Sequence, residues 1–290
     1  MKTINLIGGG RVGQTLGHLL SRDGHYLVQD LLTRSTASAE QALAFIGSGR
    51  AVGQIQDMRP AELWLLAVPD GQIAPVAAAL AACDVLPPAK VFHASGALSA
   101  LELQPLKGKG WQVASAHCLL SFANPQLAVQ QFVGTPCALE GEAPVLAELR
   151  PLMTRLGAQC FEVLTEDKLL YHAGAVFATN FLPVLQDLAE RLWQHSGMPL
   201  ALRQHLRTSL LQNAVNNITA LGPQAALTGP AARGDNVLVG RQGQAVLHWN
   251  AEAGLAYQAL SALARQLSER KTTGHLGTET AMAANSESYH

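Results

Sequence analysis

The pattern of apolar positions divides the chain into an alternating part and a helical part. Up to residue 163, short apolar runs typical of buried strands alternate with helical patterns; they cover residues 4–7, 26–33, 51–55, 63–68, 90–93, 112–116, 136–140 and 159–163. From residue 165 every periodic segment is helical. We therefore expect a doubly wound, mostly parallel α/β domain over residues 1–163 and an all-α domain over residues 164–270. Residues 271–290 lack periodicity and are expected to form a mobile tail.

A glycine-rich turn follows the first predicted strand. Gly8, Gly10 and Gly13 have the G-x-G-x-x-G spacing, and an amphipathic helix begins directly after them. Such glycines make the tight bend, let a pyrophosphate approach the backbone and let the helix pack on the strand. The first helical residues, Arg11 and Val12, would then lie beside the phosphates. This context predicts a Rossmann-like dinucleotide-binding domain; a glycine-rich turn without a ligand is the alternative.

The end of the second predicted strand favours one nicotinamide cofactor over the other. It carries Thr33, Arg34 and Ser35, a cation flanked by two hydroxyls. An acidic residue at this place selects the ribose hydroxyl of NAD, whereas an arginine accommodates the 2′-phosphate of NADP. We therefore expect NADP rather than NAD. Asp30 would favour NAD if the strand ended three residues earlier; otherwise it points at neighbouring structure.

The continuous apolar run at residues 63–68 predicts a central strand buried on both faces. Val68, Pro69 and Asp70 would follow at its carboxyl end, where ligands bind in doubly wound sheets. We expect them to lie beside the cofactor, with Asp70 also capping the next helix. Ordinary turn chemistry is the alternative.

Polar residues interrupt the first helix of the second domain, which is otherwise apolar nearly all round and is expected to be buried on most sides. Lys168, His172 and Thr179 share one stripe, and Asn180 flanks it. Buried polar groups need partners or water, so the stripe should face a cleft between the domains. Lys168 and His172 are residue types that supply a proton beside a nicotinamide, and Asn180 could orient a substrate oxygen. The alternatives are a solvated lysine, a hydrogen-bonded core histidine and an interhelical hydrogen bond.

Further polar side chains come from strand ends and from a loop. His93, Ser95 and His117 follow or end predicted strands and could line the opposite wall of the cleft, or hydrogen-bond within their loops. Arg233 lies in a loop rich in turn-forming residues and could pair with a substrate carboxylate. It could equally clamp its loop or lie in an interface.

The four cysteines are widely spaced and form no C-x-x-C pair. No short ligand spacing links His93, His117, Cys118 and His172, so we expect no metal site. Cys118 next to His117 lacks a recognisable nucleophile signature and is expected to be a buried thiol.

The amino-acid composition limits the classes of binding partner that we expect. The net charge of −1 gives no basic footprint for nucleic acid or an anionic membrane, which favours a small-molecule substrate. The first apolar run is too short for a signal peptide, and the scattered cysteines suit a reducing cytosol, so a cytoplasmic location is expected. Only 14% of residues are charged and 48% are hydrophobic. Such a chain is expected to hide surface in a homodimer formed through the helical domain; an alanine- and leucine-rich monomer is the alternative.

Taken together, these residues resemble bacterial oxidoreductases that join an N-terminal Rossmann-like NADP-binding domain to a helical C-terminal domain of unknown function. These are distantly similar to pyrroline-5-carboxylate reductase, ketopantoate reductase and 6-phosphogluconate dehydrogenase. The matching stretches are residues 7–13, 67–70, 93–98, 115–117 with 121–122, 167–168 with 171–173, 179–180, and 227–230 with 233–235. Cys118 departs from the family pattern, which has proline there. In the better-known relatives a lysine on the first helix after the sheet and a nearby asparagine do acid/base work or bind substrate, and the resemblance implies these roles for Lys168 and Asn180.

We therefore expect an NADP-dependent oxidoreductase that transfers a hydride to or from a small, anionic carbonyl, hydroxy or imino compound. Lys168 and His172 would supply the proton. The alternative is a dinucleotide-binding redox sensor or interaction protein without hydride chemistry. A flavin is a third possibility, because the same glycine turn serves both cofactors.

Overall fold

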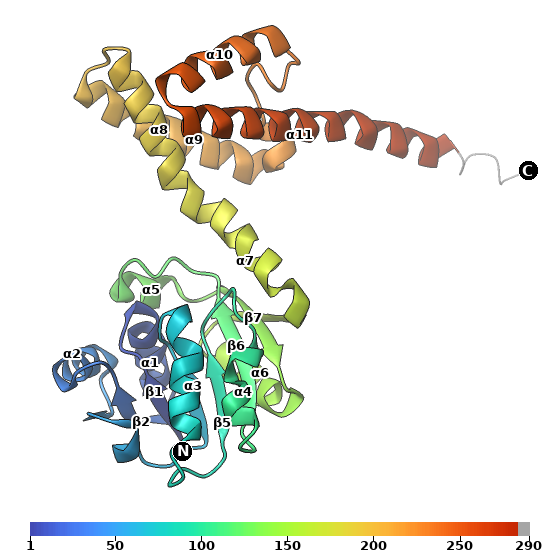
Figure 1. The fold of residues 1–290 in the computed structure, drawn as a ribbon. Helices are drawn as coiled ribbons and strands as arrows, with labels where there is room; N and C mark the ends of the chain where they lie inside the picture. The colour runs from blue at the N-terminus through green and yellow to red at the C-terminus, as the bar shows by residue number, and fades with distance from the viewer. Residues whose placement is uncertain (284–290) are drawn as a thin grey trace, which may run out of the picture. The chain divides into compact units, whose positions relative to one another are not determined.

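One eight-stranded sheet runs through the N-terminal part of the chain in the order β3-β2-β1-β4-β5-β6-β7-β8 (Figure 1). The computed structural model describes the backbone of residues 1–283 and the side chains of residues 1–270. The strands are β1 (Lys2–Ile7), β2 (Tyr26–Leu32), β3 (Arg50–Val52), β4 (Leu63–Leu66), β5 (Lys90–His93), β6 (Gln112–Cys118), β7 (Pro136–Gly141) and β8 (Gln159–Glu162). Neighbouring strands are parallel except β6 and β7. The predicted doubly wound, mostly parallel sheet is confirmed, and its first six strands have the order typical of dinucleotide-binding folds.

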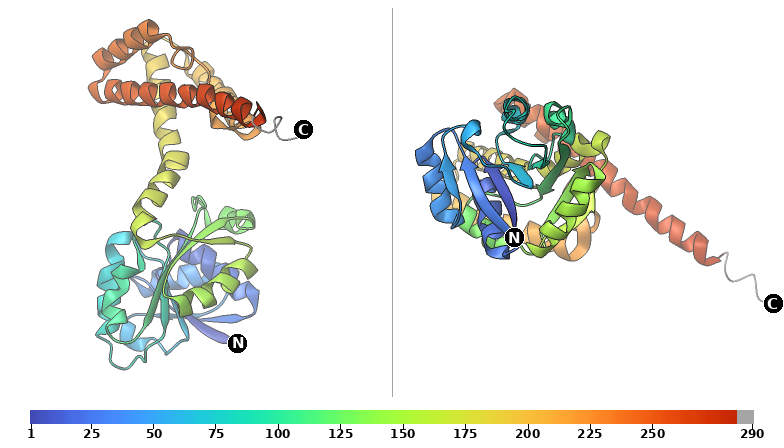
Figure 2. Two further views of the ribbon diagram at one scale, coloured as in Figure 1. Left: turned by 90° about the vertical axis from the view of Figure 1, so that its right-hand side faces the viewer. Right: turned by 90° about the horizontal axis from the view of Figure 1, so that it is seen from below.

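Helices cover both faces of this sheet because each face is a separate apolar surface. They are α1 (Arg11–Asp23), α2 (Thr36–Ile46), α3 (Ile73–Ala81), α4 (Gln104–Lys107), α5 (Pro125–Gln131) and α6 (Ala143–Arg155), and α7 (Lys168–Ala175) follows the last strand. One core joins α1, α2 and α6 to side chains such as Ile4 and Leu6. The other joins α3 and α4 to side chains such as Trp64 and Val91. The right-hand view of Figure 2 shows α3 and α4 on one side of the strands and α6 on the other.

The chain divides into two compact units, Met1–Asn180 and Phe181–His290. The sequence places the boundary after residue 163, whereas the structure keeps α7 with the sheet. The reason is the side chain of Lys168, which is only 2% exposed and hydrogen-bonds to groups that follow β5 and lie on β6. Residues 164–180 therefore belong to the first unit by their contacts.

A π-helical segment, Val176–Asn180, follows α7 and breaks the single helix that the sequence predicts. A π turn contains more residues than an α turn, so Thr179 no longer continues the stripe of Lys168 and His172. Burial on most sides is also wrong for the single chain, since Leu169 and Leu170 are 70% and 77% exposed.

The second unit is helical, as predicted. It contains α8 (Phe181–His195), α9 (Leu200–Ala226), α10 (Asn236–Trp249) and α11 (Ala251–Ala283). Gly222, with φ of 76°, interrupts the helical backbone of α9. Asp235 caps α10, because its Oδ1 accepts a hydrogen bond from Leu238 N at 3.0 Å.

The predicted tail falls partly on α11. The backbone of this helix continues past residue 270, where the predicted helical domain ends, to Ala283. Residues 284–290 of the predicted tail lie outside the described residues. Within the described part of the chain, no helix has the length and apolar character that crossing a bilayer requires.

Candidate functional site

The glycine turn after β1 forms a cradle, and the surroundings of Gly8, Gly10 and Gly13 explain differently why each position lacks a side chain. A Cβ on Gly8, whose φ is 109°, would lie 2.2 Å from Ala67 O. A Cβ on Gly13 would lie 2.1 Å from Gly8 O, whereas one on Gly10 would meet no atom within 4 Å. Gly8 and Gly13 thus allow close packing, and Gly10 leaves open space above the start of α1. Gly10 provides no side-chain cap for α1, so the first N–H groups of this helix are available to an anion. The residues present therefore fit a dinucleotide pyrophosphate.

The segment after β2 presents one unengaged cation. Thr33 Oγ1 donates to Ser35 O at 2.7 Å, and Ser35 Oγ caps α2 by accepting from Ser38 N at 3.2 Å. Arg34 is exposed and forms no hydrogen bond or ion pair with any described residue. The two hydroxyls fix the local backbone, and the guanidinium remains available to a ligand.

Asp30 lies inside β2, which ends at Leu32, and its carboxylate is fully buried. Arg59 Nη2 donates to Oδ1 at 2.7 Å, and Arg50 Nε donates to the same oxygen at 3.0 Å. Burial alone would raise the pKa of Asp30, but the hydrogen bonds from Arg59 and Arg50 hold it below its ordinary value. The carboxylate points at neighbouring structure, so it does not compete with Arg34 at the end of the strand.

Residues 68–70 follow β4 next to the glycine turn, because Ala67 packs against Gly8 and Gly13. Val68 is half-buried, and Pro69 and Asp70 are exposed. The prediction that Asp70 caps the next helix is wrong. Pro69 occupies the cap position of the 3₁₀ turn Asp70–Gln72, Gln72 occupies that of α3, and neither cap uses a side chain. The Asp70 carboxylate is therefore not engaged as a cap.

Lys168 is buried and pairs with groups delivered by two strands. Its Nζ donates to Ser115 Oγ at 2.6 Å and to Ser95 O at 3.1 Å, and lies 3.9 Å from Glu140 Oε2. Burial lowers the pKa of Lys168 to about 8, and the charge of Glu140 opposes this shift. The ammonium thus holds α7 against the segment that follows β5.

Glu140, on β7, is the acceptor of this network. Its Oε2 accepts from Ser115 Oγ and from Ala100 N, both at 2.8 Å, and its Oε1 accepts from Thr165 Oγ1 at 2.8 Å. Ser115 lies directly opposite Glu140 in the antiparallel β6–β7 pair. Every oxygen of the buried carboxylate therefore has a partner, as a charge at this depth requires.

His93 is occupied within its own loop, so the structural alternative holds for this residue. Its Nδ1 accepts from Ser95 N at 3.2 Å, which leaves Nε2 to donate to Ser99 O at 3.0 Å. Burial lowers the pKa of His93 to about 4. Ser95 Oγ likewise accepts from Leu98 N at 3.0 Å.

His117 and His172 lie together near Gly96. Their ring centroids are 5.6 Å apart, and His117 Nδ1 lies 2.9 Å from the hydroxyl oxygen of Tyr171. A Cβ on Gly96 would lie 2.5 Å from His172 Cδ2 and 2.6 Å from His117 Cε1. Burial, followed by the charges of His172 and Lys168, lowers the pKa of His117 to about 4. Only the missing side chain at position 96 lets both imidazoles approach this backbone.

A small cavity of about 190 Å³ connects these histidines with the start of α1. It is lined by Val12, Leu16, Asp70, Ala94, Ser95, Gly96, Ala116, His117, Cys118, Phe122 and His172. Every lining residue belongs to the first unit and lies on α1, β6 or α7, or in a segment that follows β4, β5 or β6. Lys168 is not a lining residue, because its ammonium is buried in the network with Glu140. The cavity is our candidate site.

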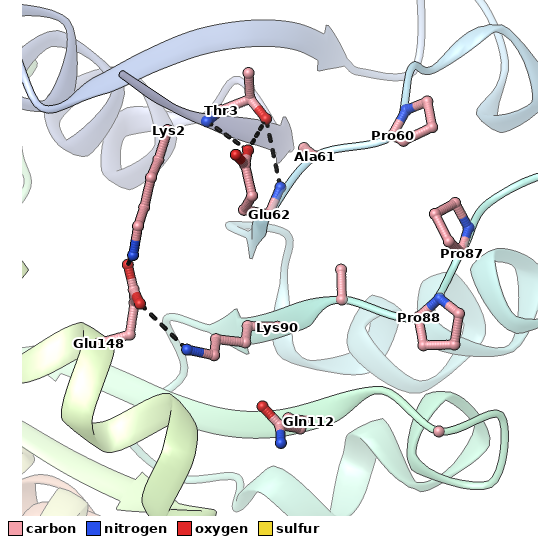
Figure 3. Close-up of a pocket in the computed structure, with 12 residues that line it drawn as sticks. Lys2, Thr3, Pro60, Ala61, Glu62, Pro87, Pro88, Lys90, Gln112 and Glu148 are labelled. Atoms are coloured by element: carbon pink, nitrogen blue, oxygen red, sulfur yellow. Dashed lines mark hydrogen bonds and ion pairs between the residues drawn. The ribbon is translucent and has the colours of Figure 1, made fainter.

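A larger hollow of about 720 Å³ lies at the opposite edge of the sheet, where β1, β4, β5 and β6 begin (Figure 3). Its charged side chains already have partners. Glu148 accepts from Lys2 at 2.5 Å and from Lys90 at 3.2 Å, and Glu62 is bonded to Thr3. Ligands of open α/β sheets bind at the carboxyl ends of strands, so this hollow is not the candidate site.

Two predicted residues are not among those that line the cavity. Asn180 is exposed, and its Oδ1 accepts a hydrogen bond from Thr179 Oγ1 at 2.8 Å. Arg233 belongs to the second unit and is exposed. The Cys118 thiol lies 3.6 Å from Cys137 Sγ and forms no hydrogen bond with a described histidine.

Glu140 pairs with Lys168 and Tyr171 contacts His117, but the sequence alone did not predict a role for either residue. Glu140 could have been found as a carboxylate at the end of an apolar run that predicts a strand. Tyr171 carries no such signal, because its partner His117 is distant in the sequence and is brought to it only by folding.

Two protein families match the chain in consecutive segments. Residues 2–117 match a Rossmann-like domain, and residues 135–264 match a domain of unknown function (DUF2520). The chain joins a Rossmann-like domain to a DUF2520 domain. This confirms the predicted resemblance. No curated protein matches the sequence significantly.

Solved structures share this fold over nearly the whole chain. A Thermotoga maritima protein is 25% identical, with a TM-score of 0.74, and the match covers 93% of this chain and 99% of that one. A Bacteroides fragilis protein, named as a candidate NADP oxidoreductase, is 20% identical, with a TM-score of 0.72 and coverage of 91% and 98%. An imine reductase from Myxococcus stipitatus, solved in complex with NADP⁺, is 18% identical, with a TM-score of 0.61 and coverage of 92% and 94%. Pyrroline-5-carboxylate reductases also share the fold. At these identities, the last three likenesses show the fold alone.

Proposed function

We propose that this Rossmann-like DUF2520 protein is an NADP-dependent oxidoreductase that transfers a hydride to or from a small carbonyl, hydroxy or imino compound. One observation carries the proposal: the cavity of about 190 Å³ connects the start of α1, at the dinucleotide cradle, with His117 and His172. Fold relatives named for NADP and for imine reduction support it. A bound nicotinamide dinucleotide supplies or accepts the hydride.

The chain's own residues divide the remaining work. Gly8, Gly10 and Gly13, with the N–H groups of Arg11 and Val12, hold the pyrophosphate, and Arg34 with its neighbours Thr33 and Ser35 holds the 2′-phosphate. Val68, Pro69 and Asp70 lie beside the cofactor. These assignments follow the geometry of the turn and the unengaged guanidinium of Arg34.

Reduction of a carbonyl or imine places negative charge on oxygen or nitrogen, so the site needs a proton donor. His117 and His172 line the cavity and are the residues we place nearest the reacting atoms. Lys168 acts from behind them by holding Ser95 O and Ser115 Oγ. Asn180 and Arg233 do not line the cavity, so the substrate-binding roles that the sequence suggests for them stay predictions.

Calorimetric titration of the full chain with NADPH and NADH tests the proposal. Arg34→Ala should weaken NADPH binding by about 10- to 100-fold, because a charge-assisted phosphate contact is lost, and leave NADH binding unchanged. Arg22→Ala is the matched control, since Arg22 is an exposed arginine in the last turn of α1, away from the cradle.

A panel of small oxo and imino compounds, both anionic and uncharged, then tests the chemistry through the loss of NADPH absorbance. Tight NADPH binding without turnover of any compound would favour the redox sensor. If the chain bound neither nucleotide, the oxidoreductase proposal would be wrong, and flavins would be tested next.

We also propose that the protein works as a homodimer formed through its helical unit. Leu210, Ile218 and Leu255 are 48%, 50% and 63% exposed in the single chain, and few charges accompany them. Large exposed apolar patches mark interaction sites. Sedimentation equilibrium of the full chain should give twice the mass of one chain, and a monomer at micromolar concentration would contradict this.

A further inference from the structure

The two histidines of the cavity have different surroundings. His117 Nδ1 lies 2.9 Å from the Tyr171 hydroxyl oxygen, whereas the His172 ring forms no hydrogen bond with any described residue. Both rings line the same cavity. One imidazole is therefore held by a fixed partner, and the other is open to exchange with water or a ligand.

The direction of the bond between Tyr171 and His117 follows from which groups need partners. His117 Nδ1 is the one hydrogen-bond partner that the described residues offer the Tyr171 hydroxyl. A half-buried hydroxyl that accepted from Nδ1–H would leave its own proton unpaired, so the phenol donates to Nδ1. Burial also raises the pKa of Tyr171, which keeps the hydroxyl protonated. The proton of neutral His117 then sits on Nε2.

Packing fixes this arrangement from several sides. The Tyr171 ring contacts His117 edge to face at 5.7 Å and Phe161 at 6.0 Å. Gly96 contacts the Cε1 side of His117 and the Cδ2 side of His172. A side chain at position 96 would therefore displace both imidazoles.

The surroundings of His117 lower its pKa, with one group acting in the opposite direction. Burial, His172 and Lys168 lower its pKa, and Asp70 alone opposes them. His172 and Lys168 come from α7, and Asp70 follows β4. The positive charge of His172 therefore disfavours a proton on His117.

We propose that the two imidazoles have separate roles, an inference that rests on the proposed function. His117, whose tautomer Tyr171 sets, donates a hydrogen bond to the substrate oxygen or nitrogen, and His172 exchanges the proton. Tyr171 is a positioning residue. Pairs of like groups kept in different protonation states are a general way to divide such work.

The reductive direction balances as follows. One hydride, from the dinucleotide, adds to the carbonyl or imine carbon, and the π pair moves onto oxygen or nitrogen. Protonated His172 gives that atom its proton, which completes the alcohol or amine. His172 is left neutral and regains a proton from water, while His117 keeps its Nε2 proton throughout.

Long-range ¹H–¹⁵N correlation spectra of the histidine-labelled full chain test this inference without a substrate. Between pH 5 and pH 8, His117 should stay neutral with its proton on Nε2. Tyr171→Phe retains the ring and removes the hydroxyl, so the tautomer ratio should move toward Nδ1–H by about fivefold, the worth of one hydrogen bond. His117→Gln and His172→Gln assign the two signals.

Tyr257→Phe is the matched control, because the Tyr257 hydroxyl donates to Gln242 within the second unit. It should leave the His117 signals unchanged. The inference is overturned if His117 takes up a proton between pH 5 and pH 8, or if its tautomer is the same in Tyr171→Phe. The same samples are titrated with NADPH. Failure of the unaltered chain to bind overturns the proposed function, and it is seen in the titration rather than in the spectra.

Discussion

The ammonium of Lys168 lies 2.6 Å from the hydroxyl oxygen of Ser115, and both side chains are buried. The pair connects the first turn of α7 to the middle of β6, across 53 positions of sequence. Lys168 therefore stabilises the packing of α7 against the sheet near the cavity. This role predicts measurable effects on stability.

Lys168→Met should destabilise the protein, because it leaves the carboxylate of Glu140 buried without its cation. We expect a loss of about 3 kcal/mol in the free energy of unfolding at pH 7, measured by denaturant titration. Lys109→Met removes an exposed pair with Asp84 and should change stability by less than about 0.5 kcal/mol. Equal losses of unfolding free energy in the two variants would contradict this stabilising role of Lys168.

The low pKa of Lys168, about 8, predicts how stability depends on pH. An unfolded lysine titrates at about 10.4, so between these values the unfolded chain binds more protons than the folded one. The free energy of unfolding should therefore rise with pH across this interval, by up to about 3 kcal/mol. The difference between the unaltered chain and Lys168→Met, measured at each pH, isolates this contribution. A difference that stays flat with pH would show that the ammonium titrates normally.

Gly10→Ala and Gly13→Ala form a matched pair that separates ligand space from packing. A methyl group on Gly10 enters open space, so the fold should keep its stability while NADPH binding weakens at least about tenfold. A methyl group on Gly13 would strike Gly8 O, so stability should fall by about 1–3 kcal/mol. Thermal unfolding and calorimetric titration of both variants give the comparison. Unchanged NADPH affinity in Gly10→Ala would place the pyrophosphate elsewhere.

Gly96→Ala should force His117 and His172 apart and lower stability by about 1–3 kcal/mol. Gly71→Ala is its control, since a Cβ there would meet no atom within 4 Å. In the same histidine spectra, only the change at position 96 should move the His117 and His172 signals. If both variants behaved like the unaltered chain, the close approach of the two rings to Gly96 would be wrong.

Asp30→Asn tests whether this carboxylate has a structural role. It removes the charge that pairs with Arg50 and Arg59, so stability at pH 7 should fall by about 2 kcal/mol. Because the pKa of Asp30 is low, its contribution is present at neutral pH and is lost as acid protonates the folded carboxylate. The ratio of NADPH to NADH affinity should not change. A shift of that ratio would return Asp30 to the cofactor site.

Local patterns predicted the sheet and the cradle, because strand periodicity and glycine spacing depend on neighbours in the sequence. The site was harder to predict. Counting an uninterrupted helix places Thr179 on the stripe of Lys168 and Asn180 beside it, and the π segment removes that register. Lys168 was correctly singled out as a polar residue on an apolar helix. Its role depends on Glu140, which reaches it only through the antiparallel pairing of β6 with β7.

Because β7 pairs with β6, the sheet continues across the boundary between the two family matches. The Rossmann-like match ends at residue 117 and the DUF2520 match begins at residue 135, yet β7 and β8 complete the sheet that β1 begins. A fragment cut between the two matches would leave β6 as a bare edge strand and Ser115 without Glu140 and Lys168. The two family segments therefore share one sheet, and side chains from both fill the core that packs against α1, α2 and α6.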